Sequence, residues 1–144
     1  MSTRVLFFAE GATLAHVARP YVLAGLLPAA WTPILARPAA QAWLTAGAGF
    51  ECIDLACQPA EVFAARLASG QPLYELDTLQ RYVAADLALI EQTRPDLVVG
   101  DFRLSLAVSA RLAHRPYATI CDAYWSPEAP PAPPPLPVLP FTRF

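Results

Sequence analysis

A short apolar run near the N-terminus, Val5–Ala9, most constrains the fold of this chain. Its aromatic and β-branched residues are typical of a strand buried on both faces. The polar, glycine-bearing segment 10–13 interrupts the run, and helical spacing then places Leu14, Val17 and Tyr21 in one stripe. The pattern predicts a strand, a tight loop and a helix. In open α/β sheets such a loop lies at the carboxyl end of a strand, where ligands bind.

Apolar runs and helical patterns continue to alternate along the chain. We expect further strands at 31–36, 50–55, 96–100 and 117–121, and helices at 38–46, 59–68, 74–93 and 103–113. Pro33 suits the first of these strands only at its start or on a sheet edge, because proline donates no ladder hydrogen bond. The alternation predicts an α/β fold, a Rossmann-like twisted parallel sheet flanked by helices.

Three of the expected helices carry further signals. The helix at 38–46 has Pro38 at its first position and Gly47 at its end. In the helix at 74–93 the expected apolar stripe consists of Leu76, Leu79, Val83, Leu87 and Ile90. In the helix at 103–113 the residues expected to face the core are Leu104, Ala107, Val108 and Leu112.

The composition of the 144-residue chain suits one domain with a sizeable core, since 56% of the residues are hydrophobic and 15% are charged. The ten basic residues are all arginine and are scattered, and the net charge is -2, so no basic stripe for nucleic acid is expected. No stretch of roughly 18 uncharged apolar residues could span a membrane, and no secretory signal is apparent. We therefore expect a cytoplasmic protein.

The three cysteines, Cys52, Cys57 and Cys121, favour reduced thiols. Their odd number and the spacing of the first two do not match a zinc site, although a metal or disulfide role is the alternative.

The end of the chain differs in composition from the rest. Half of the sixteen prolines lie between Pro127 and Pro140, a density that no helix or central strand tolerates. We therefore expect one domain over residues 1–125, followed by a proline-rich loop or tail over 126–144. An extended segment with polyproline character is the plain interpretation, and a ligand for an SH3-like module is the alternative.

His16 is the first candidate for chemistry. An imidazole near the start of a helix meets the positive end of the helix dipole, which disfavours its protonated form. A neutral ring there could take a proton from a bound hydroxyl. Alternatively, the ring only hydrogen-bonds a local carbonyl.

Asp101 is the second candidate, because it directly follows the strand expected at 96–100. A carboxylate at that strand end could bond the other nitrogen of His16, fix its tautomer and stabilise the imidazolium. The alternative is an N-cap for the next helix, since aspartate is a favoured cap residue. Both roles can hold together.

Two segments resemble the UDP-glycosyltransferase superfamily, whose members have the GT-B fold. Arg4–Phe8 followed by Gly11 and His16–Pro20 is similar to the first strand and its His-x-x-x-Pro loop in that family. Pro95–Phe102 is similar to the strand that ends in an aspartate-bearing loop, and Tyr117–Ile120 to the next strand. The resemblance extends from about Arg4 to about Pro131, with Ala15 where the family commonly has glycine before the histidine.

The resemblance implies an inverting glycosyltransferase that needs no metal and no other cofactor. The residue matching His16 would deprotonate a hydroxyl of a small-molecule or lipid acceptor, and the residue matching Asp101 would hold that histidine. The N-terminal domain would bind the acceptor, while a C-terminal domain would hold the nucleotide-sugar donor. The residues we expect to line the acceptor pocket are Gly11, Thr13, Phe102, Tyr124 and Trp125.

These assignments have plain alternatives. The aromatic residues could be ordinary core or interface residues, and Gly11 could serve the turn and a close backbone approach. Glu10 borders the first loop, where it could touch the acceptor or the sugar. Asp122 could face the acceptor, although an aspartate that opens a loop is commonly a turn former. We expect Arg19 and Arg103 to be solvated or ion-paired on helix surfaces.

The donor-binding half expected of such an enzyme does not match any part of these 144 residues. We therefore expect negligible transferase activity from this polypeptide alone, because most groups that stabilise the leaving group would be missing. Truncation, a gene fragment and a two-subunit enzyme are the explanations considered, with self-association through the uncovered surface a further expectation. The alternatives to an enzyme are a non-catalytic binding subunit or scaffold that pairs with a separate donor-binding chain, and a flavodoxin-like nucleotide-binding domain. The single glycine of the first loop, Gly11, speaks against the latter.

Overall fold

The computed structural model describes residues 2–122 and 128. Within this part, five strands form one sheet in which every neighbouring pair is parallel. The sheet has the order β3-β2-β1-β4-β5. The strands are β1 (Thr3–Ala9), β2 (Trp31–Arg37), β3 (Glu51–Asp54), β4 (Leu97–Asp101) and β5 (Tyr117–Ile120). The fold is therefore the α/β class with a parallel sheet that the sequence predicts. Tyr124, Trp125 and, apart from residue 128, the proline-rich segment lie outside the described residues.

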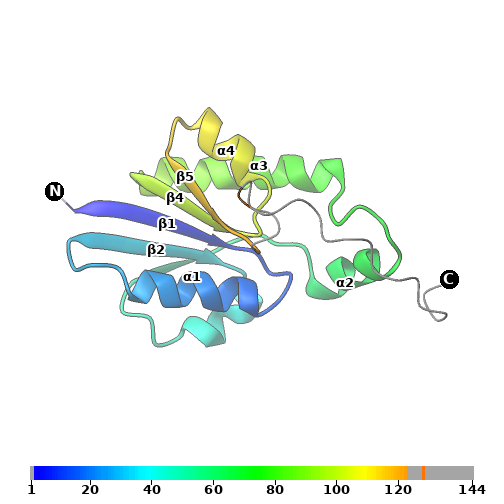
Figure 1. The fold of residues 1–144 in the computed structure, drawn as a ribbon, viewed down its shortest axis with the longest axis horizontal. Helices are drawn as coiled ribbons and strands as arrows, with labels where there is room; N and C mark the ends of the chain where they lie inside the picture. Colours follow the sequence, from blue (N-terminus) through cyan, green and yellow to red (C-terminus); the bar gives the residue numbers. More distant parts are fainter. Residues whose placement is uncertain (1, 123–127, 129–144) are drawn as a thin grey trace.

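Helices cover both faces of the sheet (Figure 1). The helical elements are α1 (Ala15–Gly25), the 3₁₀ helix η1 (Ala39–Thr45), α2 (Ala60–Ala68), α3 (Leu76–Thr93) and α4 (Leu106–Leu112). The α1 and η1 helices pack on one face, and α3 and α4 pack on the other. The α2 helix stands beyond the carboxyl ends of the strands, which places it next to the edge where ligands bind in such sheets.

The central strand β1 supplies core residues to both faces. Leu6 and Phe8 pack with α3 and α4, whereas Val5, Phe7 and Ala9 pack with α1. All five are at most 3% exposed. The continuous apolar run in the sequence is thus explained by burial on both faces rather than by alternation of one buried and one solvated face.

The strand order reverses direction at β1. From β1 the chain moves outward through β2 to β3, and it then returns to the other side of β1 through β4 to β5. Ala9 of β1 is in register with Asp101 of β4, so these two strands end side by side. In open α/β sheets, ligands bind in the crevice outside the strand ends at such a reversal.

Two local expectations about β2 and the segment after it need adjustment. Residues 39–45 form a 3₁₀ helix that follows Pro38, not an α-helix that includes it. Thr45 in this segment is buried, and its hydroxyl donates to the Ala42 carbonyl and accepts from Nε of Arg37. Pro33 lies in β2 before the first residue that pairs with β3, so the missing N–H interrupts no ladder on that side.

The inward face expected for the helix at 103–113 is wrong. The α4 helix begins at Leu106, and its buried residues are Leu106, Ser109 and Ala110. The stripe that was expected to face inward is largely exposed, at Leu104, Val108 and Leu112. The physical reason is polar: the hydroxyls of Ser105 and Ser109 donate to the buried carboxylate of Asp86 on α3, and this turns the helix away from its most apolar face. In α3 the expected stripe is half right, because Ile90 is buried while Leu76 at the helix start is 71% exposed.

Candidate functional site

His16 and Asp101 meet at the reversal of strand order. His16 lies in the first turn of α1, directly after the β1–α1 loop, and Asp101 is the last residue of β4. The Nδ1 atom of His16 lies 2.8 Å from Oδ1 of Asp101. The Asp101 side chain is fully buried, and that of His16 is 16% exposed. The predicted pair therefore forms, and Asp101 is not the N-cap of α4, because Ser105 occupies that position.

Arg19 completes a three-residue cluster with this pair. It lies on α1, one turn after His16, and its Nε and Nη2 atoms donate to Oδ2 and Oδ1 of Asp101, each at 2.7 Å. The same Nη2 lies 2.8 Å from Nδ1 of His16. Hydrogen bonding to Asp101 raises the pKa of Arg19, so the guanidinium remains charged. Arg19 is thus ion-paired as expected, but with a buried carboxylate in the crevice rather than on a helix surface.

Phe102 fixes the other side of the imidazole. Its ring stacks on the ring of His16 with centroids 4.8 Å apart and planes at 22°. It also packs edge-to-face with the ring of Phe63 on α2, with centroids 5.7 Å apart. The backbone of Phe102 is left-handed, with φ at 58°. For a bulky residue this conformation costs on the order of 1–3 kcal/mol and persists only where the surroundings enforce it. Two residues adjacent in sequence therefore fix the imidazole: Asp101 contacts its Nδ1 edge, and Phe102 covers one face of the ring.

A cavity of about 150 Å³ opens beside this cluster. Its lining residues are His16, Arg19, Phe102, Leu104, Thr119, Ile120, Cys121 and Asp122. Because Nδ1 of His16 faces Asp101, the opposite nitrogen, Nε2, is the one available to a molecule in the cavity. Leu104 and the residues at the end of β5 (Thr119–Cys121) were not expected at the site. The βα pattern places the end of β5 beside that of β4, a signal that could have indicated them.

Two other predicted site residues lie outside this cavity. Gly11 is buried, and a Cβ at this position would stand 3.0 Å from Cγ of Pro38 and 3.2 Å from Cβ of Cys57. This glycine therefore serves a close approach of the loop to the segments after β2 and β3. Thr13 is exposed, and its carbonyl accepts the backbone N–H of His16 at 3.2 Å.

Below the crevice lies a buried ionic cluster, formed by Glu10, Asp86 and Arg103. Arg103 is 1% exposed, so the expectation of a surface arginine is wrong. Its Nε donates to Asp86 and its Nη1 to Glu10, each at 3.0 Å. The guanidinium carbon also lies 3.5 Å from the centre of the Tyr82 ring. Glu10 directly follows β1 and Arg103 lies two residues after β4, so this cluster ties both loops of the site to α3.

Burial dominates the titration of groups around this cluster. Desolvation raises the pKa of Glu10, with the nearby Arg103 cation opposing the shift. Desolvation, with a further contribution from the Glu10 charge, raises the pKa of the Cys57 thiol to about 12. The Glu10 carboxylate also accepts the backbone N–H of Gly11 at 3.1 Å, and this bond anchors the loop. Over residues 2–122 and 128, no three His, Cys, Asp or Glu side chains form a group that could hold a metal, and no helix is long and apolar enough to cross a membrane.

Comparison with known proteins finds relatives that are named glycosyltransferases. It is 44% identical over 142 residues to an "Inactive PGL/p-HBAD biosynthesis glycosyltransferase" of Mycobacterium bovis (strain BCG / Pasteur 1173P2), covering 98% of this chain and 38% of that protein. It is 44% identical over 142 residues to a "PGL/p-HBAD biosynthesis glycosyltransferase" of Mycobacterium tuberculosis (strain ATCC 25177 / H37Ra), covering 98% of this chain and 33% of the relative. A "PGL/p-HBAD biosynthesis rhamnosyltransferase" of M. bovis BCG is 45% identical over 127 residues, which is 88% of this chain and 28% of that relative.

Among solved structures, "Spinosyn Forosaminyltransferase SpnP" superimposes with a TM-score of 0.52 at 20% identity, covering 83% of this chain and 31% of that one. No protein-family profile matches the sequence. The chain spans about a third of the length of the curated relatives. Over nearly its whole length the chain is thus similar in sequence to glycosyltransferases, and its fold is similar to a part of SpnP.

Proposed function

We propose that this chain is the acceptor-binding part of an inverting, metal-independent glycosyltransferase, in which His16 is the general base and Asp101 its partner. The contact of Nδ1 of His16 with the buried Oδ1 of Asp101, at the reversal of strand order, carries this proposal. The acceptor is a hydroxyl-bearing molecule, and the donor is a nucleotide sugar. We assign the donor-binding groups to a part of the enzyme that corresponds to the remaining length of the relatives.

In this mechanism the acceptor hydroxyl approaches Nε2 of His16 from the cavity. The hydroxyl proton passes to Nε2 as the acceptor oxygen forms a bond to the anomeric carbon of the sugar. The bond from that carbon to the nucleotide phosphate breaks on the opposite side, and the phosphate oxygen leaves with the electron pair. Asp101 supports the step because its carboxylate can accept a hydrogen bond from Nδ1–H and stabilise the imidazolium that forms.

The cavity walls fit such an acceptor. Phe102, Leu104 and Ile120 give it an apolar lining, while His16, Thr119 and Asp122 supply polar groups. Apolar walls with a few placed polar groups are typical of sites for small organic ligands. The part of the acceptor next to the reacting hydroxyl is therefore apolar in this proposal.

A transfer assay tests the base. The chain is joined to the donor-binding part of its M. tuberculosis relative and assayed with a panel of nucleotide sugars and phenolic or alcoholic acceptors. We expect His16→Ala to lower kcat by roughly 10²–10⁴-fold, because general-base catalysis contributes about that much. The matched control, His114→Ala, alters the second histidine of the chain, which is exposed, and should keep full turnover. Undiminished turnover in His16→Ala would remove the proposed mechanism.

A binding experiment needs no donor domain. Phenol and cyclohexanol are titrated into the 144-residue chain while the ring protons of the two histidines are followed by NMR. We expect the signals of His16 to move and those of His114 to stay, because His16 lines the cavity. If neither phenol nor cyclohexanol causes a saturable shift of the His16 signals, acceptor binding at this cavity is contradicted.

A further inference from the structure

Arg19 holds both oxygens of the carboxylate that the proposed base depends on. Its Nε and Nη2 atoms each donate to one oxygen of Asp101, and Nδ1 of His16 contacts the oxygen that Nη2 also reaches. The carboxylate is fully buried, and the Arg19 side chain is 39% exposed at the rim of the cavity. The Asp101 carboxylate thus binds two groups: the Arg19 guanidinium, which is always charged, and the His16 imidazole, which becomes a cation when it is protonated.

This sharing changes the charge balance of the pair. In a dyad without Arg19, an imidazolium would neutralise the buried Asp101 carboxylate, and proton uptake by His16 would be favoured. Here Arg19 already neutralises Asp101, and its Nη2 lies 2.8 Å from Nδ1 of the ring. A protonated His16 would therefore place two cations against one anion.

We propose, as an addition that rests on the function above, that Arg19 is a positioning residue which takes up the charge of Asp101 and so keeps His16 neutral until an acceptor proton arrives. In the productive state the ring carries its proton on Nδ1, which donates to Asp101, and Nε2 keeps its lone pair. In the competing state Nη2 of Arg19 donates to Nδ1, which requires the proton to sit on Nε2. The competing state is disfavoured because Oδ1 of Asp101 then loses its hydrogen bond from Nδ1–H.

The charged groups around the ring come from three elements. Arg19 is contributed by α1 and Asp101 by β4, and Asp122, two residues after β5, has Oδ1 4.0 Å from Nη1 of Arg19. Phe102 covers the face of the ring with an uncharged group. Asp122 is 57% exposed, so solvent screens its influence, and the balance at His16 is set by Arg19 and Asp101.

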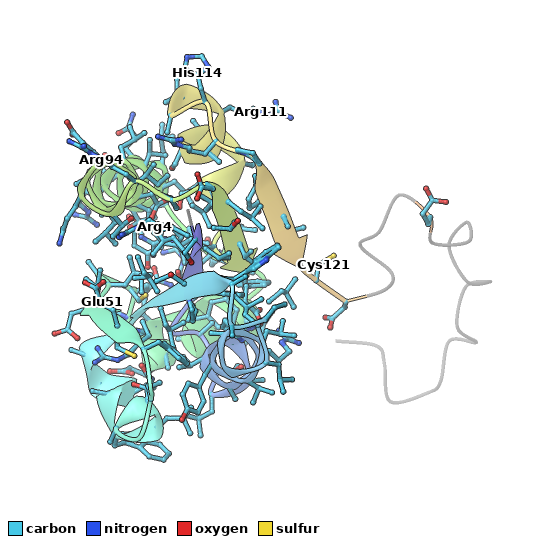
Figure 2. The ribbon with its side chains drawn as sticks, turned by 90° about the vertical axis from the view of Figure 1, so that its left-hand side faces the viewer. Arg4, Glu51, Arg94, Arg111, His114 and Cys121 are labelled. Atoms are coloured by element: carbon cyan, nitrogen blue, oxygen red, sulfur yellow. The ribbon has the colours of Figure 1, made fainter. Side chains whose placement is uncertain are left out.

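The test is an NMR titration of the histidine ring protons in the 144-residue chain. The chain has two histidines, so His114 serves as an internal reference. Figure 2 shows His114 and Arg111 together near the end of α4, apart from Cys121, which follows β5 at the cavity. We expect Arg19→Met to raise the titration midpoint of His16 by about one pH unit, a tenfold tighter proton, and to leave His114 unchanged.

Two further variants isolate the cause. Arg19→Lys retains the charge but loses the fork that grips both oxygens, so its midpoint should lie between those of wild type and Arg19→Met. Arg111→Met removes an exposed arginine far from the cavity and should change neither histidine. A His16 midpoint in Arg19→Met that equals the wild-type value would overturn the proposal.

A measurement on the unmodified chain guards against a variant that does not fold. The nitrogen-15 shifts of His16 report which ring nitrogen carries the proton, and we expect Nδ1. A proton on Nε2 would show that Arg19 donates to the ring, which overturns the proposed role. The two proposals can be tested independently. A raised midpoint in Arg19→Met together with full turnover in His16→Ala would rule out His16 as the base but leave the role of Arg19 standing.

Discussion

The imidazole of His16 and the carboxylate of Asp101 lie 2.8 Å apart, although 85 positions separate them in the chain. Neither residue reaches toward the other along an extended loop. His16 lies at the start of the helix after β1 and Asp101 at the last position of β4, and the sheet pairs these two strands directly. The contact thus follows from strand order, and a cluster that includes Arg19 and Phe102 fixes its geometry.

Removal of the buried arginine should be far more costly than removal of an exposed one. Arg103→Met leaves the carboxylates of Glu10 and Asp86 buried without their cation, which should lower the free energy of unfolding by about 3–5 kcal/mol. The control Arg111→Met, at an exposed position, should change it by less than about 0.5 kcal/mol. Urea denaturation followed by circular dichroism measures both values.

The same cluster offers a compensation test. When Glu10→Gln and Asp86→Asn are added to Arg103→Met, no buried charge is left over, and much of the lost stability should return. A triple variant no more stable than Arg103→Met would show that packing of the arginine, not its charge, dominates.

The pH dependence of stability should carry a signature of Glu10. Because burial raises the pKa of this carboxyl in the folded protein, the folded state holds a proton that the unfolded chain releases near pH 4.5. The stability contributed by this group is complete below that pH and is lost as the pH rises through the raised folded pKa. In wild type, the free energy of unfolding should therefore decrease as the pH rises above about 4.5, and in Glu10→Gln this decrease should be absent. Urea unfolding at a series of pH values measures both. Glu91→Gln, an exposed change on α3, should keep the wild-type slope.

The left-handed backbone of Phe102 should separate two substitutions of similar volume. Phe102→Leu loses the stack on His16, worth about 0.5–1.5 kcal/mol, but tolerates the conformation about as well as phenylalanine does. Phe102→Ile, the isomer of equal volume, is β-branched, and for such a residue φ at 58° is a true outlier, so it should be less stable by about 1 kcal/mol more. Thermal unfolding compares the two, and equal stabilities would contradict the strain argument.

Alkylation should distinguish the cysteines by position. Cys121 is exposed at the cavity, whereas Cys57 is half-buried and burial raises its pKa to about 12. Because the thiolate is the reactive form, iodoacetamide at about pH 8 should modify Cys121 well before Cys57. Peptide mass spectrometry over time measures this order, and Cys121→Ser should remove the fastest phase. Faster labelling of Cys57 would contradict the burial described for it.

Apolar patterning was enough to predict the sheet. The run at Val5–Ala9 is a strand buried on both faces, and the strand expected at 96–100 is observed as β4 (Leu97–Asp101), whose residues are buried or half-buried. The alternation of strands with helices predicts parallel pairing, and strand ends then bring His16 and Asp101 to one edge. This part of the site depends on topology, which local patterns encode well.

Polar burial was not predictable in the same way. The pattern of α4 favours Leu104 and Val108 as inward residues, but a carboxylate on α3, Asp86, attracts the hydroxyl of Ser109 instead. Likewise Arg103 gives no signal of its own burial, because its two partners come from distant segments. The position of Arg19 could have been predicted. A residue three positions after His16 on a helix lies on the same face, so that spacing indicates a place in the crevice.

The close packing of Gly11 against Pro38 and Cys57 determines where this protein can change during evolution or design. A side chain at position 11 would require Pro38 or Cys57 to give way by a few tenths of an ångström, so the packing of this loop tolerates little change. Variation that reshapes the cavity can instead enter at the wall formed by Leu104 and Thr119, which are distant in sequence from position 11. Libraries directed at that wall would alter which molecules are accepted, while the segment that carries the imidazole stays in place.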